Sequence, residues 1–415
     1  MSDIVVGLDI GTSSIRTAIG EISESNDIEI IGLAKVPSAG LRNGVIVNIE
    51  AAQGAIRQAI EIAEQEAGVD VSSCYTAIGG SQIEGINSKG VVGVSSKGNT
   101  PKEITQNDIN RVIESANAVQ IPMDREMLHV IPQDFIVDGI RSKEPVHMMG
   151  VRLEGEVHVI TASKTTIQNV RSCIERAGYE IERVMLKTLS AVKAVAHDDE
   201  LELGSILIDL GAGSTDVLVL INGAPVCTLS IMAGGNLVTS DISIVKGIPI
   251  SAAERIKLES GCCWLPFLTE PKEVVIPGVG GRPPELTTQV ELCNIIQPRM
   301  EEIFMMVKRA IVHKSDLRQL SGNIILTGGG AQMEGVVELA QQIFGTTAVR
   351  LGIPEKLGGD EDKYRTPEYA TVIGLLQEQK AASSDNGRGR ALKKTDKAKG
   401  ESFFAKIAKI KKAFF

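Results

Sequence analysis

Two stretches of this chain place an aspartate before a turn of glycines and hydroxyl side chains. Asp9 precedes Gly11, Thr12 and Ser13, and Asp209 precedes a second turn about 200 residues later. The second turn consists of Gly211, Ala212, Gly213, Ser214 and Thr215. Glycines let backbone amides approach an anion, hydroxyls add donors, and a carboxylate can hold a hydrated cation. One such turn is often only a turn, but the pair predicts duplicated halves that close on one polyphosphate.

Apolar runs flank both turns. Residues 4–6 and 206–208 lead into the aspartates, and residues 217–221 follow the second turn. Apolar runs on both sides of a glycine-rich turn predict buried strands joined as a hairpin. Elsewhere, strands alternate with helices predicted at 49–67, 166–177 and 189–197, which indicates α/β layers in both halves.

Residues 84–162 show a different pattern of predicted strands and helices. Strand-like segments surround one predicted helix at 106–118, which Thr105 can cap. This pattern predicts an inserted α+β subdomain.

Charge and composition exclude several classes of protein. The net charge is −9, but residues 388–415 carry +8 and the first 387 residues therefore −17. An acidic globule argues against nucleic-acid binding. The six cysteines show no CxxC spacing, so we expect small buried hydrophobic side chains or free surface thiols in a reducing cytosol. No signal peptide and no apolar run of about 18 residues is evident, which favours a cytoplasmic protein.

The C-terminal segment predicts a membrane anchor. Residues 381–400 are polar and predict a flexible linker, and residues 401–415 follow as an amphipathic helix with Ser402 as N-cap. The anchoring residues would be Phe403, Phe404, Lys406, Ile407, Lys409, Ile410, Lys411, Lys412, Phe414 and Phe415. A helix of this length spans only about 21 Å, so it would lie in the interface of an anionic membrane. Docking on the globule or in a partner's groove are the alternatives.

Beyond the two turns, a third glycine stretch follows a predicted strand. This stretch, Gly328 to Gly330, could be only a turn between a strand and a helix. It could also form the floor of a nucleotide site, where Met333 would pack on an adenine. Glu254 and Lys257 lie three residues apart on a predicted helix. They could bind a ribose or base, or form only a solvated ion pair.

Four motifs carry a resemblance to a known superfamily. They are DIGTSS (9–14), DLGAGSTD (209–216), GGNLVTSDI (234–242) and TGGGAQMEG (327–335). In order and spacing they resemble the phosphate and adenosine motifs of the actin/Hsp70 superfamily. Within it the chain is similar to the FtsA family of bacterial cell-division proteins, also at 79–92, 130–139, 276–284 and 295–303. The resemblance implies an α/β, actin-like two-lobed ATPase fold with an inserted α+β subdomain, 1C, and a C-terminal amphipathic helix.

The resemblance also divides the chain. Subdomain 1A would comprise 1–83, 163–197 and a return at 359–380, with 1C at 84–162. Subdomain 2A would comprise 198–243 and 316–358, with 2B at 244–315, before the linker and the membrane helix.

Site residues follow from the same resemblance, which implies ATP and Mg²⁺ as cofactors. Asp9 and Asp209 would position the metal and its waters, and both turns would cradle the β- and γ-phosphates. The adenosine would lie among Gly234, Gly235, Asn236, Glu254, Lys257, Gly328, Gly329, Gly330 and Met333.

Two departures from the family pattern affect the expected activity. Ser14 stands where relatives commonly have lysine, so Arg16 would neutralise phosphate. Lys187 stands in the segment that usually reads Glu-Pro-Leu-Ala. A protonated lysine can bind phosphate but cannot act as a general base. We therefore expect ATP binding with weak or negligible ATPase activity.

By resemblance, the protein would polymerise on the cytoplasmic membrane at the division site and anchor FtsZ filaments there. The FtsZ C-terminal peptide would dock on 2B around Arg299, Glu301 and Glu302. Subdomain 1C would contact the next protomer and later division proteins. The alternatives are an actin-fold adaptor of a pilus-assembly system, which needs no membrane helix, and a small-molecule kinase, which needs a second ligand pocket.

Overall fold

The computed structural model describes residues 3–95, 100–281, 283–315 and 322–392. The predicted membrane helix at 401–415 lies outside these residues, as does the end of the predicted linker. Within the described ranges, no helix has both the length and the apolar character needed to cross a bilayer.

The first lobe is built on a sheet in the order β13-β6-β1-β2-β3-β21. The first three strands of the chain are antiparallel neighbours, and β6 and β13 continue the sheet in parallel. Its strands are β1 (Asp3–Ile10), β2 (Ser14–Ile22), β3 (Ile28–Pro37), β6 (Ser73–Ile78), β13 (Glu180–Leu186) and β21 (Gly358–Gly359). Helices α1 (Ile49–Ala67) and α3 (Lys164–Ala177) cover one face, and α4 (Lys187–Val195) and α11 (Ala370–Leu392) cover the other. The predicted helix 49–67 is confirmed, with Gly68 as its C-cap.

The second lobe repeats this strand order. Its sheet runs β16-β15-β14-β19-β20, again with three antiparallel strands followed by two parallel ones. The strands are β14 (Ser205–Leu210), β15 (Thr215–Ile221), β16 (Ala224–Ile231), β19 (Asn323–Thr327) and β20 (Val349–Leu351). Because β14 and β15 correspond to β1 and β2, the prediction of duplicated halves from the two hairpins is confirmed.

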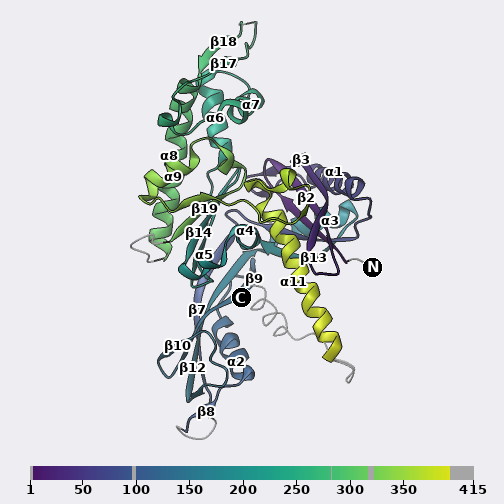
Figure 1. Ribbon diagram of the computed structural model, residues 1–415, viewed down its shortest axis with the longest axis vertical. Helices are drawn as coiled ribbons and strands as arrows, with labels where there is room; N and C mark the ends of the chain where they lie inside the picture. Colours follow the sequence, from purple (N-terminus) through teal and green to yellow (C-terminus); the bar gives the residue numbers. More distant parts are fainter. Residues whose placement is uncertain (1–2, 96–99, 282, 316–321, 393–415) are drawn as a thin grey trace.

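Helices and a small hairpin extend the second lobe at the top of Figure 1. They are α6 (Gly235–Lys246), α7 (Ile250–Ser260), α8 (Gln289–Ser315), α9 (Val336–Phe344), β17 (Glu273–Ile276) and β18 (Glu285–Thr288). Pro298 lies inside α8 and does not begin it. The six cysteines are buried free thiols, which is the first of the two predicted alternatives.

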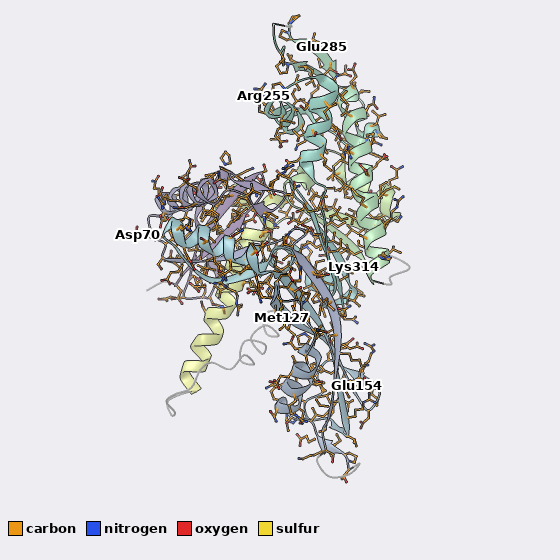
Figure 2. The ribbon with its side chains drawn as sticks, turned by 180° about the vertical axis from the view of Figure 1, so that it is seen from behind. Asp70, Met127, Glu154, Arg255, Glu285 and Lys314 are labelled. Atoms are coloured by element: carbon orange, nitrogen blue, oxygen red, sulfur yellow. The ribbon has the colours of Figure 1, made fainter. Side chains whose placement is uncertain are left out.

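The inserted segment forms its own sheet in the order β10-β9-β12-β7. Its elements are β7 (Ile83–Gly93), β8 (Lys102–Glu103), α2 (Gln106–Asn117), β9 (Arg125–Val137), β10 (Ile140–Ser142), β11 (Met149–Gly150) and β12 (Arg152–Ser163). The carboxylate of Asp108 accepts the Thr105 backbone N–H at 3.0 Å, which confirms Thr105 as the cap of α2. Figure 2 shows Glu154 of this insert and Glu285 of the β17–β18 hairpin at opposite ends of the molecule.

Short elements complete the chain. They are β4 (Leu41–Arg42), β5 (Val45–Ile46), α5 (Asp198–Leu203), α10 (Glu361–Tyr364) and the 3-10 helices η1 (Leu265–Phe267), η2 (Gly329–Gln332) and η3 (Pro367–Tyr369).

The C-terminal helix is longer than the sequence predicted. Helix α11 continues to Leu392 and projects from the body (Figure 1), so residues 381–392 are helical and do not belong to a flexible linker. Good helix formers at 377–382 and the absence of proline let an existing helix propagate through this stretch.

Candidate functional site

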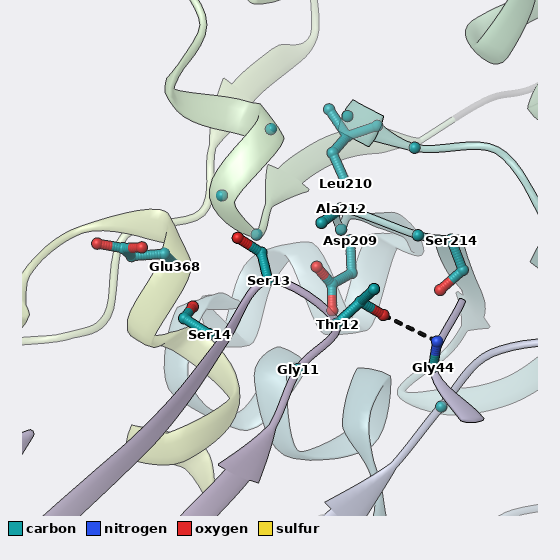
Figure 3. A pocket seen from close by; sticks show the side chains of 18 of the residues that line it. Gly11, Thr12, Ser13, Ser14, Gly44, Asp209, Leu210, Ala212, Ser214 and Glu368 are labelled. Atoms are coloured by element: carbon teal, nitrogen blue, oxygen red, sulfur yellow. Dashed lines mark hydrogen bonds between the residues drawn. The ribbon is translucent and has the colours of Figure 1, made fainter. Parts of the chain in front are cut away.

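A cavity of about 760 Å³ lies between the two lobes and is lined by both hairpin turns. Figure 3 shows Thr12 and Ser13 of the first turn facing Asp209, Ala212 and Ser214 of the second. All three glycine stretches predicted from the sequence reach this cavity, together with Glu254, Lys257 and Met333. The predicted residues therefore lie around one cavity, and its ligand stays a prediction.

The two turns have the same backbone hydrogen bond. In the first, the Gly11 N–H donates to the carbonyl of Ser14 at 3.1 Å, and in the second the Gly211 N–H donates to the carbonyl of Ser214 at 3.0 Å. This bond closes each turn between its paired strands and directs the residues within the turn toward the cavity. The equivalence extends the duplication from the sheets to the site.

The second turn touches the first lobe beside a hydrogen bond that the first turn makes within its own lobe. The Gly44 N–H donates to the Thr12 hydroxyl at 2.8 Å, and a Cβ on Gly213 would lie 2.7 Å from Cα of Asn43 and 3.0 Å from Oγ1 of Thr12. No side chain fits in that space. A glycine at 213 is therefore required where the second lobe meets the first.

Three aspartates meet at the end of the cavity where phosphate binding is predicted. Asp9 and Asp216 are buried, and Asp216 accepts the Gly80 N–H at 3.0 Å. Burial raises the pKa of Asp209 to about 7, Asp216 adds to the shift, and the ammonium of Lys187 opposes it. Burial also raises the pKa of Asp216. The cluster therefore contains more negative charge than its own cations balance.

Each cation of this cluster is paired with a carboxylate. The Lys187 ammonium lies 2.6 Å from Oδ1 of Asp9. The Arg16 guanidinium donates to Glu368 at 2.6 Å and lies 3.6 Å from Asp9. Arg16 lines the cavity as expected. To bind a phosphate, its guanidinium would have to divide its N–H donors between the phosphate and these two carboxylates.

Lys35 and Glu368 were not found from the sequence, although both line the cavity. The Lys35 ammonium lies 2.7 Å from Glu368. Burial favours a neutral Glu368, but Arg16 and Lys35 hold its pKa below the ordinary value. Because 333 residues separate Lys35 from Glu368, no local pattern could have linked them.

The predicted adenosine side is built from the second lobe. Gly328 has φ +82°, and a Cβ there would lie 2.2 Å from Oδ1 of Asp209, so the position admits only glycine. Lys257 donates to Glu254 at 2.6 Å and to Thr239 at 2.9 Å, which makes the predicted pair a packed, hydrogen-bonded one.

Two predicted residues form hydrogen bonds that hold the second turn: Asn236, which does not line the cavity, and Thr215, which does. Asn236 is not among the described residues that line it, and its backbone N–H donates to the carbonyl of Ala212 at 2.8 Å. The Thr215 hydroxyl donates to the carbonyl of Ala233 at 2.8 Å. Both residues hold the second turn in place.

The residues predicted to contact a partner lie on α8. Arg299 donates to both carboxylate oxygens of Asp241 on α6, at 2.6 and 3.0 Å, and also contacts Glu302. Glu301 accepts a bond from Gln297 at 2.8 Å. The partner contact itself stays a prediction.

Two sheets of equal strand order with a cleft between them define an actin-like protein. Solved structures agree with this class. The chain is similar to a PilM–PilN type IV pilus biogenesis complex, with a TM-score of 0.63 and 19% identity over 90% of this chain and 97% of that one. It is also similar to MreB5 of Spiroplasma citri bound to ADP, with a TM-score of 0.54 and 14% identity over 93% and 99%. At these identities the likeness concerns the fold alone.

Sequence comparison assigns the family. The family model for "Cell division protein FtsA" matches residues 206–374, and that for "SHS2 domain inserted in FTSA" matches residues 80–161. The chain is 43% identical over 376 residues to cell division protein FtsA of Borreliella burgdorferi, covering 90% of each. It is 36% identical over 383 residues to that of Escherichia coli K12, covering 90% of this chain and 89% of the relative. The chain belongs to the FtsA family of cell-division proteins.

Proposed function

We propose that this chain is an ATP-binding cell-division protein that polymerises on the cytoplasmic membrane at the division site and anchors FtsZ filaments there. The observation that carries the nucleotide part is the pair of equivalent turns on one cavity. Its volume of about 760 Å³ falls inside the range of about 300–1,000 Å³ usual for small-molecule sites.

The residues at the phosphate end fit a polyphosphate and a cation. Ser13 and Thr12 offer hydroxyls beside the close-packed glycine backbone. Burial first and the neighbouring Asp216 second raise the pKa of Asp209, and a cation bound beside these carboxylates would favour their charged forms. Among the described residues, no group of three or more histidine, cysteine or acidic side chains is placed to bind a metal directly. Mg²⁺ would thus be held through waters and phosphates by Asp9 and Asp209, and would neutralise phosphate charge.

Nucleotide would act mainly as a clamp. The turn at 11–13 belongs to the first lobe and the turn at 211–215 to the second, so a ligand that contacts both holds the lobes at one angle. Gly328 and Met333 would receive the adenosine from the second lobe. The angle between the lobes sets the shape of a protomer, and hence its fit to the next protomer in a filament.

The membrane and partner functions rest on sequence and family. Residues 402–415 would form an interfacial helix, and many such helices along one filament would bind firmly through avidity. The FtsZ C-terminal peptide would bind around Arg299, Glu301 and Glu302 in subdomain 2B. The insert, subdomain 1C, would contact the next protomer and later division proteins.

Liposome co-sedimentation tests this function most directly. Full-length protein and a variant lacking residues 402–415 are mixed with vesicles rich in phosphatidylglycerol, with ATP and the FtsZ C-terminal peptide. We expect the full chain to pellet with vesicles and to carry the peptide, and the truncated chain to stay in solution. Full-length protein that remains in the supernatant would refute the tether.

A further inference from the structure

Lys187 brings a tethered ammonium into the carboxylate cluster of the cavity. It is the first residue of α4, directly after β13, and its side chain is 15% exposed. Its ammonium lies 2.6 Å from Oδ1 of Asp9 and donates to the carbonyl of Ile10 at 3.0 Å. The side chain is therefore fixed at the base of the first turn.

The neighbouring chain leaves room for this arrangement. A Cβ on Gly79 would lie 3.2 Å from Cδ of Lys187 and 2.8 Å from Oδ2 of Asp216. Any larger residue at 79 would push against both the lysine stem and the aspartate. Lys187 thus passes through a gap that only glycine keeps open.

The ammonium of Lys187 interacts electrostatically with all three aspartates of the cluster. Burial alone would lower the pKa of the amine, but Asp9, Asp209 and Asp216 raise it above the ordinary value. The other nearby cation, Arg16, is also bonded to Glu368. Lys187 is therefore the cation whose field reaches all three aspartates, from both lobes.

We propose that Lys187 is a built-in counter-cation of the nucleotide site, which supplies part of the charge neutralisation that a divalent metal otherwise provides. This inference rests on the proposed binding of ATP. An ammonium has three N–H donors, of which Ile10 takes one and Asp9 attracts a second, so one remains for a phosphate oxygen. ATP binding by this chain consequently depends only weakly on Mg²⁺.

The experiment measures ATP affinity by isothermal titration calorimetry, once in Mg²⁺ and once in EDTA. The variants are Lys187→Met, which keeps the stem but removes the charge, and Lys187→Arg, which keeps the charge. The matched control is Lys193→Met, because Lys193 lies on the same helix and pairs with buried Glu378 at 3.1 Å but does not line the cavity.

We expect EDTA to weaken binding by less than about tenfold in the wild type, the K187R variant and the K193M control, and by more than about a hundredfold in K187M. If Lys187 had only a structural role, its replacement would lower ATP affinity equally in both buffers. The ratio of the affinities in Mg²⁺ and in EDTA therefore reports the effect of its charge. A second measurement needs no nucleotide. Mg²⁺ alone should raise the melting temperature of K187M more than that of the wild type, because only the variant lacks the internal cation.

The outcomes separate the two proposals. Equal EDTA ratios for wild type and K187M, with ATP bound in Mg²⁺, would overturn the role of Lys187 alone. Failure of the wild type to bind ATP in either buffer would overturn the nucleotide function, and the inference with it. If K187M does not fold, Lys187→Gln, which can still donate to the Ile10 carbonyl, serves in its place.

Discussion

Nε2 of His158 on β12 lies 2.9 Å from the hydroxyl of Thr228 on β16. The chain enters the insert from the first lobe, yet this contact joins the insert to the edge strand of the second. Asn87 on β7 supports it by donating to the carbonyl of Val226 at 2.9 Å. On the other side, His129 on β9 accepts the Leu186 N–H of the first lobe at 3.0 Å. The insert therefore bridges both lobes through two buried histidines.

The His158 contact predicts a loss of stability in acid. Burial lowers the pKa of His158 to about 4, with the charge of Lys314 adding to the shift, against 6.5 for the unperturbed group. Because the unfolded state binds a proton first, the contribution of His158 is complete above pH 6.5 and is lost as the pH falls toward 4. The expected slope is about 1.4 kcal/mol per pH unit.

Urea unfolding of the wild type and of His158→Gln between pH 4.5 and 8 measures this effect. Other groups, including Asp209, titrate in both proteins, so the difference between the two isolates His158. We expect the stability advantage of the wild type to shrink steadily below pH 6.5. Parallel stability profiles would show that His158 does not remain neutral in the fold.

Gly213→Ala should separate the lobes. The added methyl would lie 2.7 Å from Cα of Asn43, and a rigid backbone contact of this kind costs about 1–3 kcal/mol to relieve. Since Gly213 lies in the second turn, we expect a shift of that turn and a fall in ATP affinity of at least about tenfold, measured by calorimetry.

Gly54→Ala is the control for this substitution. Gly54 lies on the exposed side of α1, and a Cβ there meets nothing within 4 Å. The control should gain about 0.5–1 kcal/mol of stability and bind ATP like the wild type. Unchanged ATP affinity in Gly213→Ala would mean that the contact between Gly213 and Asn43 does not set the geometry of the site.

Local residue types account for the parts of the site that the sequence predicted. Asp9 and Asp209 precede glycine turns between apolar runs, and both features act within one hairpin. Two such hairpins predicted the duplicated halves, and the equal strand order of the two sheets confirms them. The end of α1 and the start of α2 could also be predicted from local residue types, because Gly68 and Thr105 each act on the adjoining helix.

Long-range packing decided what the sequence could not predict. The Lys35–Glu368 pair joins strand β3 to a C-terminal segment that carries no motif. The docking of His158 on Thr228 depends on the path of an inserted sheet, which residue patterns inside the insert do not specify. Asn236 and Thr215 belong to recognisable motifs, but only the fold determines that Asn236 lies outside the cavity and that the Thr215 hydroxyl binds the carbonyl of Ala233.

The charged face of α8 predicts different effects for neighbouring residues. Glu301 bonds to Gln297 and Glu302 pairs with Arg299 at partly exposed sites, so Glu301→Gln and Glu302→Gln should each change the unfolding free energy by less than about 1 kcal/mol. Both are expected to weaken FtsZ-peptide binding about fivefold, or about 1 kcal/mol. Arg299→Ala also removes the bidentate bond to Asp241 and should cost about 1–3 kcal/mol in unfolding free energy.

Fluorescence anisotropy of labelled peptide and urea unfolding together measure these variants. Glu114→Gln, an exposed acid on α2 of the insert, is the control and should affect neither quantity. Normal peptide binding by both α8 glutamate variants would place the contact elsewhere on the second lobe.

Hydrolysis of ATP should be slow because Lys187 lies in the segment of the cleft where relatives usually have an acid. The carboxylates around Lys187 hold its pKa above the ordinary value, so the amine is protonated at neutral pH and cannot accept a proton from water. In a single-turnover experiment with protein in excess over radiolabelled ATP, we expect a rate far below about 1 s⁻¹, the lower end of the usual enzyme range. Lys187→Met should remain equally slow, because methionine cannot act as a base either. A wild-type rate near 1 s⁻¹ would require another group to activate the water, and Asp209, with its pKa raised to about 7, would be the first residue to test by Asp209→Asn.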